Sequence, residues 1–278
     1  MPADFHLPPM GFGPGSQPDP SGEELTYMSM PQDMMVYAPH YPEIENSSAV
    51  GPALILLRQV AGACARVAAG GATERFETGG LDAANRALIA ETLGTGEVSV
   101  KIRTIPAIAA QESRFAGVWV LSGLDHDAIE VGPIPSRALS PGLTPRRAAR
   151  GAEAPRAGAV INAPPIYAEL ADKSASWAGK DDLHVVNLSL LPHTPEDLVW
   201  LDAALGEGAV TILSRGYGNC RITATALPHV WRVQFFNSMD SLILDTFEVT
   251  AMPEVALAAP EDLADSSSRL LKVLEAIA

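Results

Sequence analysis

The sequence predicts an α+β protein made of two tandem units, each a helix packed on an antiparallel sheet, behind a disordered N-terminal tail. Two observations predict the units: residue matches recur at an offset of 112 residues, and helical and strand periodicities follow one another in both matched stretches. A third predicts the tail, because the first 47 residues are rich in Pro, Met and Gly and lack periodicity. We therefore divide the chain into a flexible tail at 1–47, a first unit at 48–136, a basic Pro/Gly linker at 137–157 and a second unit at 158–278.

The tail contains a cluster of adaptable apolar side chains between Leu25 and Tyr37, four of which are methionines. Methionine side chains re-pack easily around a partner. Two interpretations remain open: the cluster binds a partner, or it lies as a strap on the protein's own core.

The first unit begins with a helix predicted over residues 49–69, where apolar residues recur at helical spacing and Gly70 follows the last turn. Cys64 lies on the apolar stripe, so we interpret it as a core residue. A second helix is predicted over 82–93. The strands that follow are expected at Glu97–Ile105, Phe115–Ser122 and Ala128–Val131.

The second unit begins with a helix predicted at Pro165–Ala178 and a strand at His184–Leu190. Thr194 then caps a helix whose first residue is Pro195, and Gly206 ends it. The remaining strands are expected at Val210–Ser214, Arg221–Phe236 (broken near Pro228) and Leu242–Val249.

The internal repeat rests on matches that keep the same order in both halves. The stretch from Leu93 to Val98 matches that from Leu205 to Val210, and Val118-Trp119 matches Val230-Trp231 at the same offset of 112. After a short insertion, Ile129-Glu130-Val131 resembles Phe247-Glu248-Val249. Because a tryptophan beside valine in a strand usually faces a core, we expect both tryptophans of the repeat to be buried at equivalent positions.

Composition limits the classes of function. The formal net charge of -14 disfavours nucleic-acid binding and suits a basic partner segment, although solubility alone would also explain it. The N-terminus lacks the charge and apolar pattern of a signal peptide, and the most apolar stretch, Ala53–Ala69, is interrupted by two arginines. We expect a cytoplasmic protein that does not insert into a membrane.

The two halves differ most at Ser214–Arg221, where glycines surround Tyr217. We expect this hairpin tip to contact a partner, because loops on rigid scaffolds often carry binding. The candidate partner-binding residues are Arg215, Gly216, Tyr217, Gly218, Asn219, Cys220 and Arg221. A plain turn is the alternative.

Enzymatic signatures are missing from the sequence. There is no G-x-S-x-G or H-E-x-x-H pattern, no zinc spacing among the histidines, and no C-x-x-C, since Cys64 and Cys220 are far apart. We therefore expect no catalytic residue, no metal site and no cofactor.

The second unit resembles a known family. The motifs SRGYGNCRI, VWRVQFFN and LILDTFEVT, within roughly residues 183–255, resemble the C-terminal domain of the HupH/HyaF hydrogenase expression/formation family, and ETLGTGEVSVKI and FAGVWVL extend the resemblance to the first unit. The resemblance implies an accessory protein in the maturation of an uptake [NiFe]-hydrogenase. It implies a chaperone that acts on the iron–sulfur small subunit before twin-arginine export.

Two alternatives to this chaperone remain open. One is an iron–sulfur cluster carrier or assembly factor that uses Cys220, together with Cys64 or across a dimer. The other is a scaffold that joins other hydrogenase maturation proteins.

Overall fold

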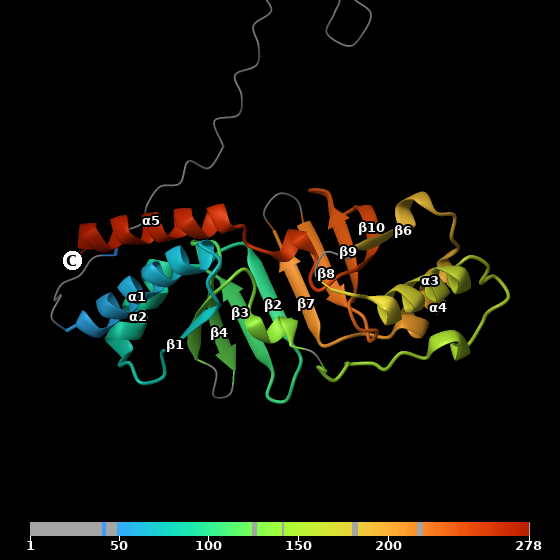
Figure 1. Ribbon diagram of the computed structural model, residues 1–278, viewed down its shortest axis with the longest axis horizontal. Coiled ribbons are helices and arrows are strands. Elements are labelled where there is room, and N and C mark those ends of the chain that lie inside the picture. The colour runs from blue at the N-terminus through green and yellow to red at the C-terminus, as the bar shows by residue number, and fades with distance from the viewer. Residues whose placement is uncertain are drawn as a thin grey trace, which may run out of the picture. The chain divides into compact units, whose positions relative to one another are not determined.

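The protein is described by a computed structural model over residues 41–42, 49–123, 127–140, 142–179, 183–215 and 219–277. Residues 1–40 and 43–48 lie outside this description, so the predicted tail stays a prediction. Figure 1 shows the helices and the sheet of the described residues.

Helices and strands follow one another in the same order in both halves. The first half consists of α1 (Gly51–Ala68), β1 (Glu74–Glu77), α2 (Ala83–Leu93), β2 (Val98–Ile102), β3 (Ile108–Glu112), β4 (Val118–Gly123), β5 (Ala128–Val131) and the 3-10 turn η1 (Ser136–Leu139). After η2 (Gly151–Glu153), the second half consists of α3 (Ala163–Ser176), β6 (His184–Asn187), η3 (Leu188–Leu190), α4 (Pro195–Leu205), β7 (Val210–Ser214), β8 (Asn219–Ala224), β9 (Val230–Phe236), β10 (Leu242–Val249) and η4 (Glu254–Ala256). The helix α5 (Pro260–Ile277) follows.

The strands of the described residues form one ten-stranded sheet in the order β1-β5-β4-β3-β2-β7-β8-β9-β10-β6. Every pairing is antiparallel, which confirms the predicted α+β class. The two halves meet where β2 pairs with β7, with Val100 opposite Ile212. The strand order therefore reads the same outwards from this central pair in both directions.

Matching contacts occur in the two halves. Trp119 on β4 and Trp231 on β9 are 1% and 6% exposed, so both are buried as predicted. Each indole Nε1 donates to the backbone oxygen of the residue that directly follows the next strand in sequence. Trp119 donates to Gly132 at 3.0 Å, and Trp231 donates to Thr250 at 3.2 Å.

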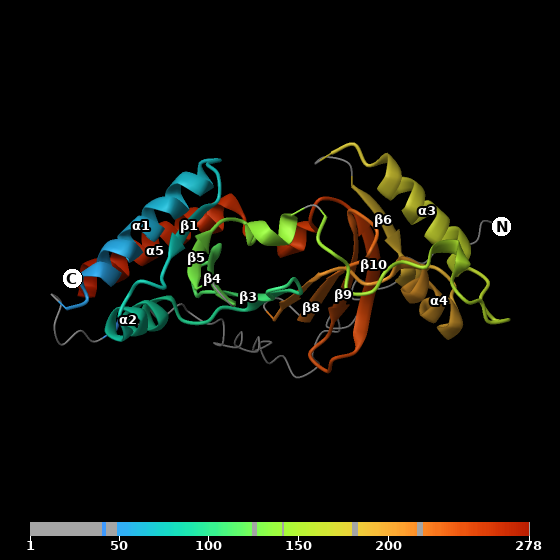
Figure 2. The same ribbon diagram turned by 90° about the horizontal axis from the view of Figure 1, so that it is seen from below.

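The helices lie on one face of the sheet. Residues paired across antiparallel strands share a face, so the register places Val118 of β4 on the same face as Val230 of β9. Val118 packs with α1, α2 and α5 in one buried cluster, and Val230 packs with α3 and α4 in another. Figure 2 shows these two helix groups at the two ends of the sheet.

The opposite face of the sheet carries the central core. Val100, Ile212 and both tryptophans belong to this cluster, and residues from η1 and η4, including Ala138 and Ala256, cover it. The middle of the helix-bearing face stays accessible, with exposed Lys101 and Arg221.

The predicted cap of α4 is present and also joins α4 to α3. Thr194 Oγ1 accepts from the Asp197 amide at 3.0 Å, and Asp197 Oδ2 accepts from the Thr194 amide at 3.0 Å. Asp197 Oδ1 accepts from the amides of Ile161 (2.8 Å), Asn162 (3.0 Å) and Ala163 (3.0 Å). One buried carboxylate thus fixes the starts of two helices.

Several elements differ from the prediction. The strand predicted to reach Leu190 ends at Asn187, because the Asn187 side chain accepts from the Ser189 amide and begins η3. The strands β1 and β3 and the helix α5 were not predicted. Although α5 follows the second half, it packs on α1, where Ser267 Oγ donates to the Ala61 oxygen at 2.7 Å.

Residues 142–157 of the predicted linker are attached to the end of α4. Arg147 and Glu207 exchange two backbone hydrogen bonds of 3.0 and 2.8 Å, and the Arg147 guanidinium binds the Asp202 carboxylate at 2.7 Å. Residues 142–157 therefore pack against the second half of the fold.

Candidate functional site

The predicted partner-binding segment lies at the end of the β7–β8 hairpin. Arg215 follows β7 and donates its backbone N–H to the Glu97 oxygen at 3.2 Å, which ties the hairpin to the start of β2. Asn219 and Arg221 lie on β8 and point to the helix-bearing face. Gly216, Tyr217 and Gly218 lie outside the described residues.

A groove of about 640 Å³ borders this segment. The guanidinium of Arg221 lies 5.6 Å from the ring centre of Phe236, and Asn219 Nδ2 donates to Asp240 Oδ1 at 3.0 Å. These contacts join β8 to the β9–β10 hairpin. The described lining residues are Leu213, Ser214, Arg215, Asn219, Cys220, Arg221, Phe236 and Asp240.

Cys220 borders the groove, but its side chain is buried in the central core. Because side chains alternate along a strand, it points to the opposite face from its neighbours on β8 and enters the central core, where it is 4% exposed. Burial, and then the charge of Glu248, raise the pKa of Cys220 to about 11. The prediction that the hairpin tip presents this thiol together with its neighbours is wrong.

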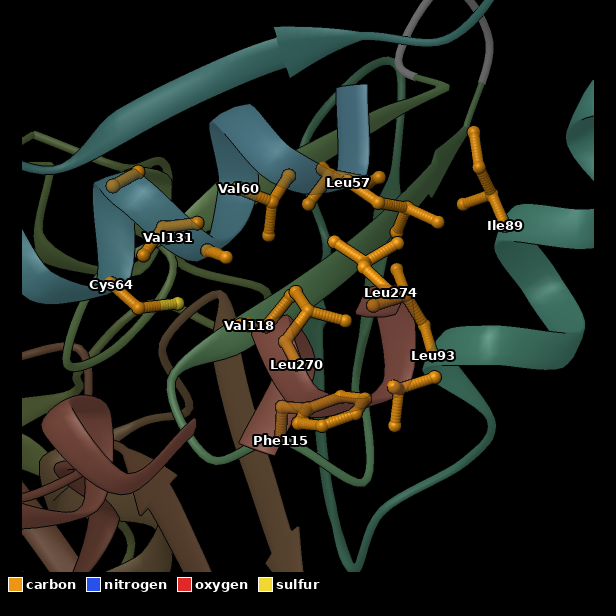
Figure 3. Close-up of a cluster of buried hydrophobic side chains, with 14 of the residues drawn as sticks. Leu57, Val60, Cys64, Ile89, Leu93, Phe115, Val118, Val131, Leu270 and Leu274 are labelled. Carbon is orange, nitrogen blue, oxygen red and sulfur yellow. The ribbon is translucent and has the colours of Figure 1, made fainter. Parts of the chain in front are cut away.

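Cys64 is also buried, in the cluster around α1 and α5 (Figure 3). Burial raises the pKa of Cys64 to about 12. The position of Cys64 in this cluster confirms the prediction that it is a core residue. Neither cysteine forms a disulfide, and the two belong to different clusters. A protonated, enclosed thiol is a poor nucleophile and a poor metal ligand.

Two arginines on this face are held by side-chain hydrogen bonds. Arg232 binds Asp245 through two hydrogen bonds of 2.9 and 2.5 Å. Arg103 donates to Thr211 Oγ1 at 2.7 Å. Arg221 and Lys101 remain exposed here, so the face offers cations although the whole chain is acidic.

Few groups in the described structure are suited to catalysis. Among the described residues, no cluster of three or more His, Cys, Asp or Glu side chains could hold a metal ion. Burial raises the pKa of Glu112 to about 7, but this carboxylate accepts from the Gly117 amide at 3.0 Å within a turn. The described helices also include none that is long and apolar enough to cross a membrane.

Sequence reasoning missed Phe236 and Asp240. Both come from the β9–β10 hairpin and reach the groove only because β9 pairs with β8. A prediction of strand pairing would have placed Phe236 opposite Asn219.

Comparison with known proteins gives consistent matches. The C-terminal conserved region of the HupH hydrogenase expression protein family matches residues 160–277. Over 277 residues, the chain is 61% identical to the hydrogenase expression/formation protein HupH of Rhodobacter capsulatus, with 100% of both chains covered. It is 45% identical to the hydrogenase expression/formation protein HoxQ of Cupriavidus necator, over 98% of this chain and 97% of the relative. It is 33% identical to the hydrogenase-1 operon protein HyaF of Escherichia coli, over 71% of each.

Proposed function

Because this chain belongs to the HupH family of hydrogenase expression/formation proteins, we propose that it is a cytoplasmic chaperone for the iron–sulfur small subunit of an uptake [NiFe]-hydrogenase, acting before twin-arginine export. The proposed maturation role is supported by the identity of 61%, over the full length, to a hydrogenase expression/formation protein. The accessible groove and the buried thiols support a binding role rather than chemistry.

We place client binding at the β7–β8 end, on Arg215, Tyr217, Asn219 and Arg221. Arginine and tyrosine are frequent anchors of protein interfaces, and each can contribute about 2 kcal/mol when it is desolvated. The exposed guanidinium of Arg221 is already oriented by the ring of Phe236, which lowers the cost of ordering it on binding.

The test measures the affinity of purified small subunit for four variants. Arg215→Ala, Tyr217→Ala and Arg221→Ala should each weaken binding about tenfold or more, with melting temperatures close to wild type. Arg58→Ala, at an exposed arginine on α1, is the matched control and should bind like the wild type. Unchanged affinity in all three site variants would exclude this surface.

The cluster-carrier alternative has less support, because both cysteines are buried in separate clusters. Anaerobic purification followed by iron and sulfide analysis separates the two functions. In a chaperone, Cys220→Ser leaves the affinity of each folded molecule unchanged. In a carrier, it removes bound iron. A scaffold would instead bind other maturation proteins while leaving the small subunit unbound.

We further infer that the two halves arose as tandem repeats. The inference is supported by the shared order of elements, the matching strand order about β2 and β7, and the equivalent indole contacts of Trp119 and Trp231.

A further inference from the structure

The two ends of the ten-stranded sheet are built from different kinds of residue. β1 carries Glu74, Arg75 and Glu77, and Glu74 also binds Arg66 of α1 at 2.7 Å. Charged side chains on an edge strand discourage the addition of another strand. Val185 of β6 lies opposite Glu248, as Arg75 of β1 lies opposite Glu130. The corresponding position is therefore charged at one end and apolar at the other.

Exposed apolar side chains gather along the β6 end. Val185 is 48% exposed and Leu183, just before β6, is 60% exposed. The chain then continues into η3, which contacts β10. There, Ser189 Oγ accepts from the Asp245 backbone amide at 2.9 Å. We call the following exposed residues the β6 border: Leu183, Val185, Leu190 and Leu191.

The backbone of β6 is available for pairing. Along an edge strand, alternate residues direct N–H and C=O groups away from the sheet. Within the described ranges, residues 184–187 make backbone hydrogen bonds with β10 and with no other strand. A further strand could therefore pair with β6.

The charges of this region define the partner. The stretch 183–191, which holds the border, contains no Lys or Arg. Carboxylates accompany the border instead: Glu169 contacts His184 at 2.7 Å, and Glu248 lies opposite Val185. An extended apolar segment with flanking Lys or Arg complements this surface in both shape and charge.

We propose that the β6 border binds such a segment of the hydrogenase small subunit as an eleventh strand of the sheet. The identity of this partner rests on the proposed function, whereas the border itself does not. A second copy of the chain fits poorly, because it would bring another formal charge of -14 to a surface that already carries carboxylates. Two four-residue strands alone would also bury little area for a stable dimer.

The test compares Val185→Arg with Arg75→Val, which exchange residue types between the two ends of the sheet. Binding of the purified small subunit and of the purified large subunit to the full-length protein is measured by biolayer interferometry. Val185→Arg should weaken small-subunit binding at least tenfold, whereas Arg75→Val should leave it within about twofold of wild type. The melting temperature of Val185→Arg should stay near that of wild type, because the replaced side chain is half exposed. If this variant does not fold, Leu183→Lys replaces it.

The outcomes separate the two proposals. Wild-type affinity in Val185→Arg and Leu183→Lys overturns the inference, as does a wild-type dimer that Val185→Arg converts to a monomer. If the large subunit alone binds, and Val185→Arg removes that binding, the proposed function fails while a docking strand at β6 stands. If neither subunit binds the wild type, both proposals are wrong.

Discussion

Replacing Asp197 is the sharpest test of how the second half is held together. Its carboxylate accepts four backbone N–H groups: three at the start of α3, and that of Thr194 at the start of α4. Asp197 and the Ala163 residue that donates to it are both 0% exposed. Asp197→Ala would leave these donors without their acceptor in a region that water reaches poorly.

The size of the loss follows from these four contacts. Hydrogen bonds to a charged acceptor contribute about 1 kcal/mol or more each, and a buried donor left unpaired costs a similar amount. Because the donors nearer the surface regain water, we expect Asp197→Ala to lower the free energy of unfolding by about 3–4 kcal/mol. Asp197→Asn retains one acceptor oxygen and should lose about half as much.

Urea unfolding at several pH values measures this loss. Burial acts to raise the pKa of Asp197, but hydrogen bonds from Thr194, Ala163 and Ile161 outweigh it and lower the pKa to about 2. The stabilisation is therefore complete above the ordinary value of 3.8 and is lost as the pH falls through about 2. The difference between wild type and Asp197→Ala should be large at pH 7 and shrink towards pH 2.

Asn85, the matched control, lies on α2, where its Oδ1 accepts from the Ala53 amide at 2.8 Å at the start of α1. Asn85→Ala should destabilise the protein with a weaker dependence on pH, since the amide does not titrate and acts only through the exposed Asp82 carboxylate, to which its Nδ2 donates at 2.9 Å. A loss below about 1 kcal/mol at pH 7 for Asp197→Ala would refute the reasoning.

Three other expectations can be tested in the same way. Glu112→Gln should raise the melting temperature at pH 8 but hardly at pH 4, because the raised pKa of about 7 makes ionisation of the buried carboxyl unfavourable; an equal effect at both pH values contradicts this. Trp119→Phe and Trp231→Phe should each lower the free energy of unfolding by about 1–2 kcal/mol through the lost indole hydrogen bond. Urea titration measures both losses, and clearly unequal losses would contradict the equivalence of the two tryptophans. Deleting residues 1–24 should leave the melting temperature nearly unchanged, and a large fall would place the tail in the core.

Local signals in the sequence predicted much of the fold. Thr194 followed by Pro195 and two acidic residues predicted the start of α4, and the capping box is present. The valine–tryptophan pairs predicted buried positions in two strands. These signals succeed because each acts through neighbours in the chain.

Of the missed elements, β3 depends on distant contacts, whereas the helical pattern of α5 is local and only its packing partner is distant. β3 has the sequence IAAQE, which has little strand propensity, and it is a strand because β2 and β4 pair with it on both sides. α5 carries buried residues at helical spacing, including Leu263, Leu270 and Leu274, so its pattern was readable. Its packing on α1, more than two hundred residues away, was not.

The candidate site was predicted only in part. The glycines around Tyr217 marked the hairpin, but the direction of each side chain needed the register of β8. One position of that register decides whether Cys220 or Arg221 reaches the surface. The apolar β6 border escaped prediction because it is defined by the end of the sheet.

The most direct test of the chaperone proposal is the mass of the complex formed with the purified small subunit that still carries its export signal. Size-exclusion chromatography with light scattering measures it, with the mature large subunit as the comparison. We predict a stable complex with the small subunit that contains both chains and requires no iron bound to this protein. Separate elution of the two chains at micromolar concentrations would contradict the account.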